Sequence, residues 1–197
     1  MTIKAQLVNH AAFIHNRNVT AGWWNDLTPE KNSILLTRNR PELLDLVISE
    51  VSEADHGFVE NINDDKLTHL PMFDVEIADV AIRLFDMIGA EESRYGDVID
   101  FEYDAAIDVF VAKLVISSHE RQLLTIINEC SAALEHYRKT RIPQYRDKLA
   151  GALAATFAIA AVRGIDLFDV IDQKVAFNAV RPDHKVEHRQ SDEGKKI

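Results

Sequence analysis

Two short pairs of acidic residues are the part of this sequence best suited to chemistry. Glu50 and Glu53 form the first pair, and Glu76 and Asp79 form the second after an interval of residues 54 to 75. Each pair is spaced three positions apart, so on a helix its two carboxylates point to the same side. A hydrophobic stripe overlaps each pair, and an unpaired carboxylate on a packed face is strongly unfavourable.

Four carboxylates that converge in one crevice repel one another unless a cation neutralises them. A ligand set of oxygen atoms, without cysteine or histidine, favours a hard divalent ion, so the pairs predict a Mg²⁺ site that Mn²⁺ can also fill. The alternative is that these acids lie on solvated helix faces, as most do in a chain that is 27% charged. Two pairs that both overlap hydrophobic stripes favour the metal site.

A polar run near the end of the chain carries groups that suit phosphate. Lys174, Asn178 and Arg181 follow the spacing i, i+4 and i+7 along one face of a predicted helix, and Lys185 comes just after it. Arginine binds phosphate through two hydrogen bonds and lysine as a point charge. The alternative is a solvated basic face at a helix C-terminus, where the helix dipole favours cations.

Two adjacent tryptophans, Trp23 and Trp24, stand in an otherwise polar stretch from residue 19 to residue 39. Two neighbouring indoles cannot both face one small core, so we expect one to close the end of a helical bundle and the other to line a pocket. Both a plug and a stacking surface for a nucleobase are consistent with this pattern.

The order Glu50-x-x-Glu53 and Glu76-x-x-Asp79 resembles the signature of the MazG-like, all-α nucleoside triphosphate pyrophosphohydrolases. That superfamily also includes dimeric dUTPases, dCTPases and phosphoribosyl-ATP pyrophosphohydrolases. Three flanking stretches are similar to those of short MazG-like proteins often carried by phages: residues 21–27 (AGWWNDL), 64–67 (DDKL) and 174–185 (KVAFNAVRPDHK). The resemblance spans about residues 10 to 90 and 164 to 186.

The resemblance implies Mg²⁺-dependent hydrolysis of a (deoxy)nucleoside triphosphate to monophosphate and pyrophosphate. It makes the four acids metal ligands and catalytic groups, one of them also serving as the base for water. It places the substrate contacts on Lys174, Asn178, Arg181 and Lys185, and tips the two tryptophans toward the nucleobase. Two alternatives stay open: hydrolysis of an alarmone such as ppGpp, and a catalytically silent helical module that binds a partner.

Bulk composition narrows the class of protein. The 197 residues suffice for a sizeable core, and the net charge of −10 disfavours nucleic acid or an anionic membrane as the main partner. The single cysteine, Cys130, fits a reducing cytoplasm. Neither a leader nor an apolar run of membrane-spanning length is evident, so we expect a cytoplasmic protein whose Ala-rich segment 149–162 is a core helix.

Hydrophobic periodicity predicts an all-α helical bundle. The resemblance implies that this bundle is MazG-like. We expect helices over 3–17, about 41–60, 71–88 with a stop at Gly89, one or two over 98–139 with a break near Ser117, 145–163 closed by Gly164, and about 166–180. A short loop is expected at 91–96, and residues 183–197 are expected to fray. Alternation typical of a strand is not seen.

The second half of the chain repeats the hydrophobic frame of the first. Residues 44–54 align with 123–133, and the helix ending at Gly89 aligns with 149–164. The acids are mostly lost in the copy, where Glu129, Ala132, Gly151 and Ala154 take the places of Glu50, Glu53, Glu76 and Asp79. Chance similarity between amphipathic helices is the alternative.

The repeat suggests one compact domain in three parts. A catalytic repeat occupies residues 1–90, a degenerate repeat with the phosphate-binding helix occupies 91–182, and a tail follows at 183–197. The resembled family builds each site from two subunits or two repeats. We therefore expect a homodimer unless the internal repeat replaces the second subunit.

Overall fold

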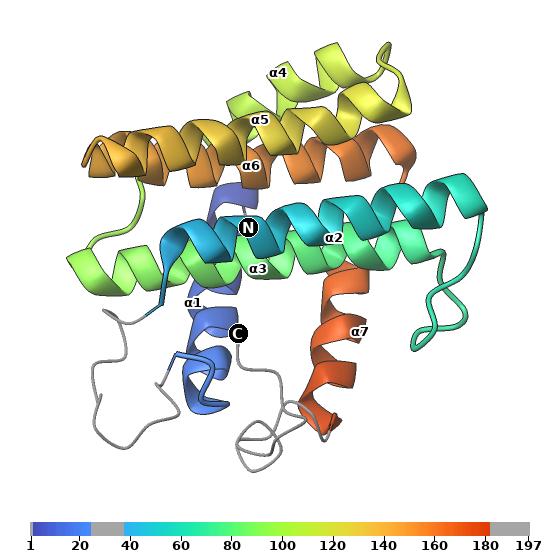
Figure 1. Cartoon of the computed structure of the whole chain (residues 1–197), viewed down its shortest axis with the longest axis horizontal. Coiled ribbons are helices and arrows are strands. Elements are labelled where there is room, and N and C mark those ends of the chain that lie inside the picture. The colour runs from blue at the N-terminus through green and yellow to red at the C-terminus, as the bar shows by residue number, and fades with distance from the viewer. Residues whose placement is uncertain (1, 25–37, 182–197) are drawn as a thin grey trace.

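The described part of the chain, residues 2–24 and 38–181 of a computed structural model, is all-α, with seven helices and no strand (Figure 1). The predicted all-α class is therefore confirmed. The helices are α1 (Ile3–Thr20), α2 (Arg40–Glu60), α3 (Met72–Tyr95), α4 (Tyr103–Leu114), α5 (His119–Arg138), α6 (Ile142–Arg163) and α7 (Leu167–Val180).

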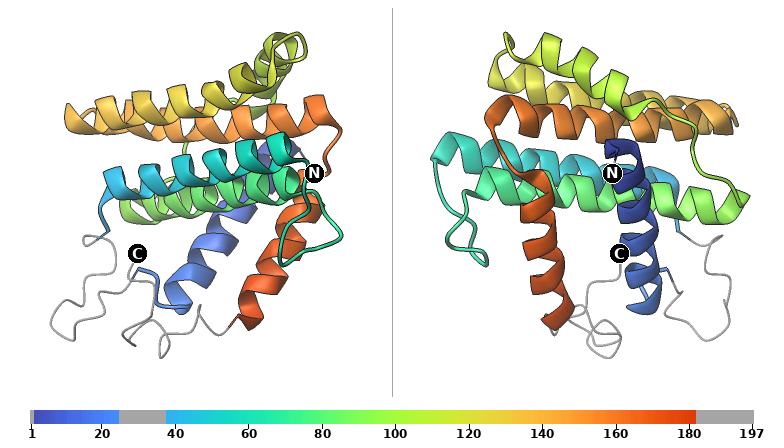
Figure 2. Two further views of the ribbon diagram at one scale, coloured as in Figure 1. Left: turned by 45° about the vertical axis from the view of Figure 1, so that its right-hand side comes forward. Right: turned by 180° about the vertical axis from the view of Figure 1, so that it is seen from behind.

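Two antiparallel helical hairpins, α2–α3 and α5–α6, stack on each other at the centre of the molecule (Figure 1). Helix α3 packs on α6 and α2 packs on α5, while α4 covers the outer side of α6. Helices α1 and α7 cross α3 steeply and project away from the α5–α6 hairpin (Figure 2). The α2–α3 hairpin is thus covered on one side by α5–α6 and carries α1 and α7 on the other.

Helix α6 forms the most deeply buried element. Every residue from Leu149 to Ala160 is buried, which confirms that the Ala-rich segment is a core helix. Small side chains allow its neighbours to approach closely on all sides. Among the described helices, none is by itself long and apolar enough to cross a bilayer, and only the sharply bent pair α6 and α7 meets that criterion jointly.

Helix α3 does not stop at Gly89, as the sequence suggested, but continues to Tyr95 and ends at Gly96, whose φ is 70°. The predicted loop at 91–96 and the expected boundary at residue 90 therefore both fall inside or at the end of this helix. A Cβ at Gly89 would lie 2.5 Å from the carbonyl oxygen of Ala11 and 2.6 Å from the Cβ of His15. Gly89 is thus the point where α1 crosses α3, not a helix stop.

Most of the remaining predicted boundaries agree with the structure, but three ends differ. Helix α4 begins at Tyr103 and not near residue 98. Helix α1 runs on to Thr20, and α6 begins at Ile142 with Pro143 in its first turn, where a missing N–H does no harm. The expected break near Ser117 separates α4 from α5, and Gly164, with φ 70°, ends α6. The predicted fraying of residues 183–197 concerns a segment outside the described residues.

The connection between α2 and α3 is folded back by a buried aspartate. Asp64 is 4% exposed, and its Oδ1 accepts hydrogen bonds from the backbone N–H groups of Lys66 and Leu67. This side-chain turn replaces backbone hydrogen bonds that the loop lacks. It also holds Asp65 and Lys66 against the cavity described next.

Candidate functional site

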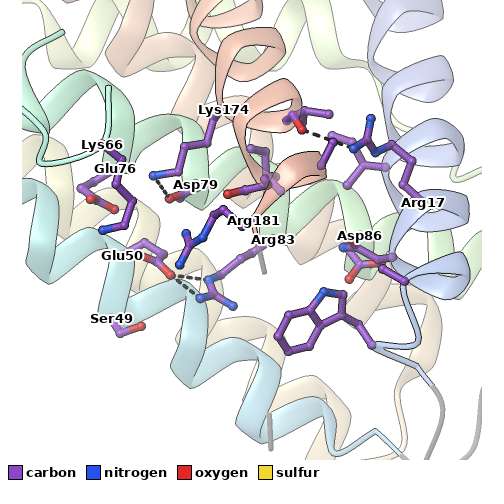
Figure 3. A pocket seen from close by; sticks show the side chains of 18 of the residues that line it. Arg17, Ser49, Glu50, Lys66, Glu76, Asp79, Arg83, Asp86, Lys174 and Arg181 are labelled. Carbon is purple, nitrogen blue, oxygen red and sulfur yellow. Dashed lines mark hydrogen bonds and ion pairs between the residues drawn. The ribbon is translucent and has the colours of Figure 1, made fainter. Parts of the chain in front are cut away.

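A cavity of about 670 Å³ opens where α1 and α7 leave the α2–α3 hairpin (Figure 3). Its volume lies in the range of about 300–1,000 Å³ that is usual for small-molecule sites. Charged side chains of both signs line it: Glu50, Glu53, Asp64, Asp65, Glu76, Asp79 and Asp86, together with Arg17, Arg38, Lys66, Arg83, Lys174 and Arg181.

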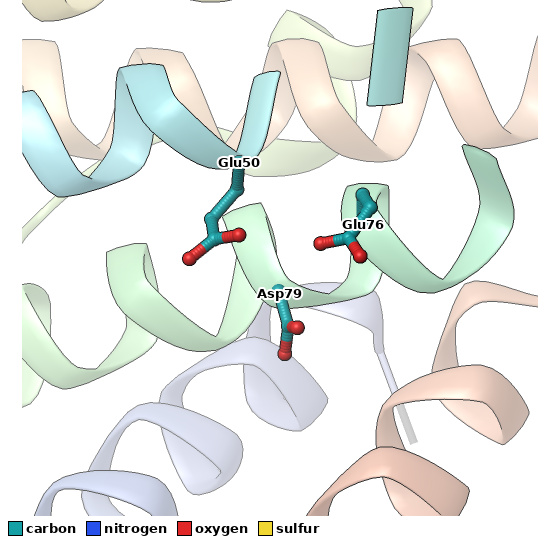
Figure 4. A group of neighbouring side chains, drawn as sticks. All are labelled: Glu50, Glu76 and Asp79. Atoms are coloured by element: carbon teal, nitrogen blue, oxygen red, sulfur yellow. The ribbon is translucent and has the colours of Figure 1, made fainter. Parts of the chain in front are cut away.

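Three of the predicted acids meet in this cavity. Glu50 from α2 and Glu76 and Asp79 from α3 each offer one oxygen such that the three oxygens lie within 4.8 Å of one another (Figure 4). Glu50 is 7% exposed and Glu76 5%. This buried trio has the composition and the spacing to hold a metal ion.

Glu53 does not join the trio, so the expected set of four converging carboxylates becomes a set of three. Its side chain lines the same cavity but is exposed. Glu50 shares its side of α2 with the buried residues Val47 and Ala54. Three residues further, a helix has turned short of a full circle by about 60°, which carries Glu53 toward solvent.

The carboxylate of Glu76 is buried with incomplete hydrogen bonding. Its Oε2 has no hydrogen-bond partner in the described part of the chain. Burial raises the pKa of Glu76 to about 8, and the negative charges of Asp79, Glu50 and Glu53 add to that rise, while Lys174 opposes it. A buried oxygen of this kind beside other carboxylates suits a cation as its partner.

The other two members of the trio carry ion pairs. Arg83 donates from Nε to Glu50 Oε1 at 2.6 Å, and Lys174 Nζ lies 2.8 Å from Asp79 Oδ2. Burial raises the pKa of Asp79 to about 6 even though Lys174 counteracts it. For Lys174 burial lowers the pKa, but its attraction and hydrogen bond to Asp79, together with the negative charges of Glu76 and Asp64, outweigh burial, and the net pKa is raised.

The polar run on α7 reaches the cavity as its spacing predicted. Lys174, Asn178 and Arg181 all line it, and the buried Oδ1 of Asn178 lacks a hydrogen-bond partner within the described residues. Lys174 is engaged with Asp79, so its first role is to balance the trio. Arg181 lies just after α7, with its guanidinium 5.8 Å from the ring of Phe177. Lys185, the fourth predicted contact, lies outside the described residues.

The two tryptophans divide as expected, one toward the core and one toward the cavity. Trp23 is half-buried and lines the cavity. Trp24 is 4% exposed, and its Nε1 donates to Asp86 Oδ1 at 2.8 Å. The same oxygen pairs with His15 Nδ1 at 2.8 Å. Trp24 does not line the cavity, which corrects its assignment as a substrate contact. The hydrogen bond to Asp86 holds its indole in the core.

Three arginines of the cavity wall, Arg17, Arg38 and Arg83, were not singled out from the sequence. Arg83 follows Asp79 by four residues and so shares its helix face, a signal that was available. Arg17 donates to the backbone oxygen of Val175 and ties α1 to α7. Burial lowers the pKa of Arg38, which lies over the ring of Trp24, and no sequence pattern indicated this packing.

Comparisons with known proteins return no match to a family model, to a curated protein or to a solved structure.

Proposed function

We propose that the protein is a Mg²⁺-dependent nucleoside triphosphate pyrophosphohydrolase of the MazG-like kind, which cleaves between the α and β phosphates. The observation that carries this proposal is the buried trio with the orphaned oxygen of Glu76, set in a cavity that arginines also line. A cluster of acids next to cations suits a polyanion bound together with a divalent ion.

Several cavity residues have distinct roles in this reaction. Glu50, Glu76 and Asp79 would hold the ion, and Lys174 would keep Asp79 in place. The bound ion would neutralise phosphate oxygens and lower the pKa of a water. Arg181 and Asn178 would bind phosphate oxygens, and Trp23 would face the base.

Glu53 is the carboxylate best suited to take the proton of the attacking water. It lines the cavity without belonging to the trio, and it is exposed, so water reaches it. A group that is not itself a metal ligand keeps a lone pair for the proton. In this assignment Glu53 stays catalytic although it leaves the ligand set.

A nucleotide panel tests the proposal. The purified chain is incubated with (deoxy)nucleoside triphosphates and ppGpp, with Mg²⁺ or Mn²⁺, and monophosphate and pyrophosphate are measured. We expect pyrophosphate release that requires the metal and falls by at least about a hundredfold in Glu76→Gln. Glu60→Gln, which removes an exposed acid at the end of α2 that does not line the cavity, is the matched control and should keep full activity. Activity in excess chelator would contradict the proposal.

A silent helical module is the second candidate, and a specific observation favours it. Arg83 and Lys174 already neutralise Glu50 and Asp79, so two of the three carboxylates need no metal for stability. Such a module would bind no divalent ion, whereas the enzyme must. A titration with Mn²⁺ alone therefore separates the two functions before any substrate is known.

We also propose that the α5–α6 hairpin is a degenerate copy of α2–α3. In the sequence alignment Glu129 and Gly151 occupy the places of Glu50 and Glu76. A Cβ built on Gly151 would lie 2.7 Å from Glu129 Oε2, so these two positions face each other across their hairpin as Glu50 and Glu76 do across theirs. Glu129 pairs instead with Lys148 at 3.0 Å, which removes the need for a metal.

A further inference from the structure

Two cations of the protein already occupy the carboxylate trio. Arg83 donates from Nε to Glu50 Oε1 at 2.6 Å and contacts the same oxygen through a second guanidinium nitrogen. Lys174 pairs with Asp79 through its Nζ. A dication among these oxygens would stand next to both positive charges, so the ion pairs and the metal oppose each other.

Exposure decides which of the two cations can give way. The side chain of Lys174 is 6% exposed, so on leaving Asp79 its charge would stay buried and lose its ion pair, which is unfavourable. The side chain of Arg83 is 36% exposed and lies on the cavity wall. Its guanidinium can turn into the cavity and meet water or an anion there. Arg83 is therefore the exchangeable cation.

We propose that Arg83 is a placeholder that neutralises Glu50 until a divalent ion arrives, and then binds a phosphate group of the substrate. This inference rests on the proposed function and adds a regulated binding residue to it. A planar guanidinium suits the bidentate recognition of phosphate. Figure 3 shows Arg83 and Arg181 both reaching toward the side of the cavity that holds Glu50. The released Arg83 would thus join Arg181 on the same phosphate chain.

The competing role for Arg83 is to fix the orientation of Glu50 for the metal. The two roles predict opposite signs. A placeholder competes with the metal, so its removal tightens metal binding, whereas an orienting residue supports the metal, so its removal weakens binding. The metal affinity in the absence of substrate therefore decides between them.

The first experiment measures Mn²⁺ binding to the full chain without nucleotide, by the electron paramagnetic resonance signal of the free ion. We expect Arg83→Met to bind Mn²⁺ about tenfold more tightly than wild type, because the metal no longer competes with a charge-assisted contact to Glu50. Arg83→Gln, which keeps a polar side chain, should change in the same direction. Circular dichroism verifies that both variants are folded.

Lys66→Met is the matched control. The side chain of Lys66 is also 36% exposed and lines the same cavity, but it pairs with Asp65 at 2.7 Å and not with the trio. Removing its charge changes the electrostatic potential of the cavity in the same general way as removing the charge of Arg83. We expect it to alter Mn²⁺ affinity by less than about threefold, as is usual for an exposed pair.

The second experiment measures binding of inorganic tripolyphosphate at saturating Mn²⁺ by calorimetry. We expect Arg83→Met to bind it about tenfold more weakly, with Lys66→Met close to wild type. Tighter Mn²⁺ binding together with weaker tripolyphosphate binding in the same variant is the result expected for the exchange. Unchanged or weaker Mn²⁺ binding in both Arg83 variants, with Mn²⁺ bound by wild type, would overturn the exchange alone. Failure of wild type to bind Mn²⁺ would overturn the proposed function as well.

Discussion

At the scale of single residues, Glu76 connects the stability of the fold to the chemistry of the site. Its carboxylate is buried beside Glu50 and Asp79 and keeps one oxygen without a hydrogen bond in the described residues. A residue chosen only for stability would be neutral at this place, because a buried, unpaired charge is unfavourable. A carboxylate at this place suits a cation as its partner, and the trio could hold a metal ion.

The pKa of Glu76 predicts how the metal-free protein responds to pH. Because burial raises this pKa from 4.5 to about 8, the folded state holds the proton that the unfolded state releases. Stability from this group is complete below pH 4.5 and is lost as pH rises through about 8. We expect Glu76→Gln to match wild type in urea unfolding at pH 5 and to exceed it by roughly 2 to 4 kcal/mol at pH 8.5.

Metal addition supplies the control for this pH effect. Mn²⁺ at pH 8.5 should stabilise wild type, since a ligand bound only by the folded state shifts the equilibrium toward it, and should leave Glu76→Gln nearly unchanged. Equal stability of wild type and Glu76→Gln at both pH values would show that the carboxylate is solvated.

The acidic site shows which residue-level predictions the sequence supports. The trio could be predicted because Glu50, Glu76 and Asp79 overlap hydrophobic stripes, and a stripe fixes the direction of a side chain. Glu53 lies about 60° around the helix from Glu50. Periodicity alone cannot tell whether such a position at the edge of a packed face is buried or exposed. The hydrogen bond from Trp24 to Asp86 could not be predicted either, because the two residues are far apart in the sequence and meet only in the folded chain.

At the scale of helices, Gly89 shows why boundaries are harder to predict than helices themselves. The sequence contains Gly89 and Gly96 seven residues apart, and either can end α3. Only Gly96 adopts the left-handed conformation that ends a helix, with φ 70°. Gly89 is small because α1 crosses it, and that crossing is a tertiary contact between residues far apart in the chain.

Alanine at the two glycines should therefore have different effects. Gly89→Ala places a methyl group 2.5 Å from the backbone of Ala11 and must push α1 away from α3, for which we expect a loss of about 1–3 kcal/mol in thermal or urea unfolding. It should also change the near-ultraviolet circular dichroism of Trp24, because His15 shares Asp86 with that indole.

Gly96→Ala meets no atom within 4 Å and only strains a positive φ, so it should destabilise by about 1 kcal/mol without altering the tryptophan signal. An unchanged spectrum in Gly89→Ala would mean that the helix crossing relaxes without reaching the cavity wall.

At the scale of the whole molecule, the stacking of the two hairpins bears on how many chains a site needs. His119 of α5 stacks on Phe58 of α2 with ring centroids 3.8 Å apart, and its Nε2 is 2.8 Å from Asp55 Oδ1. Arg163 of α6 joins the same cluster through His119 Nδ1 at 2.7 Å. The α5–α6 hairpin thus covers one whole side of the α2–α3 hairpin within the same chain.

A site complete in one chain has a kinetic consequence. Except for Lys185, every residue proposed to bind the metal, the phosphates or the nucleobase lines one cavity. Helices α1, α2, α3 and α7 of a single chain and the segments beside them form this cavity. We therefore expect the rate of pyrophosphate release to stay proportional to protein concentration on dilution from micromolar to nanomolar levels, whatever oligomer light scattering finds at high concentration. Mixing Glu76→Gln with wild type should lower the rate only by the dilution of active chains. A specific activity that falls on dilution, or a mutant that poisons wild type beyond its share, would mean that a second chain completes the site, since an obligate assembly loses activity as its subunits separate.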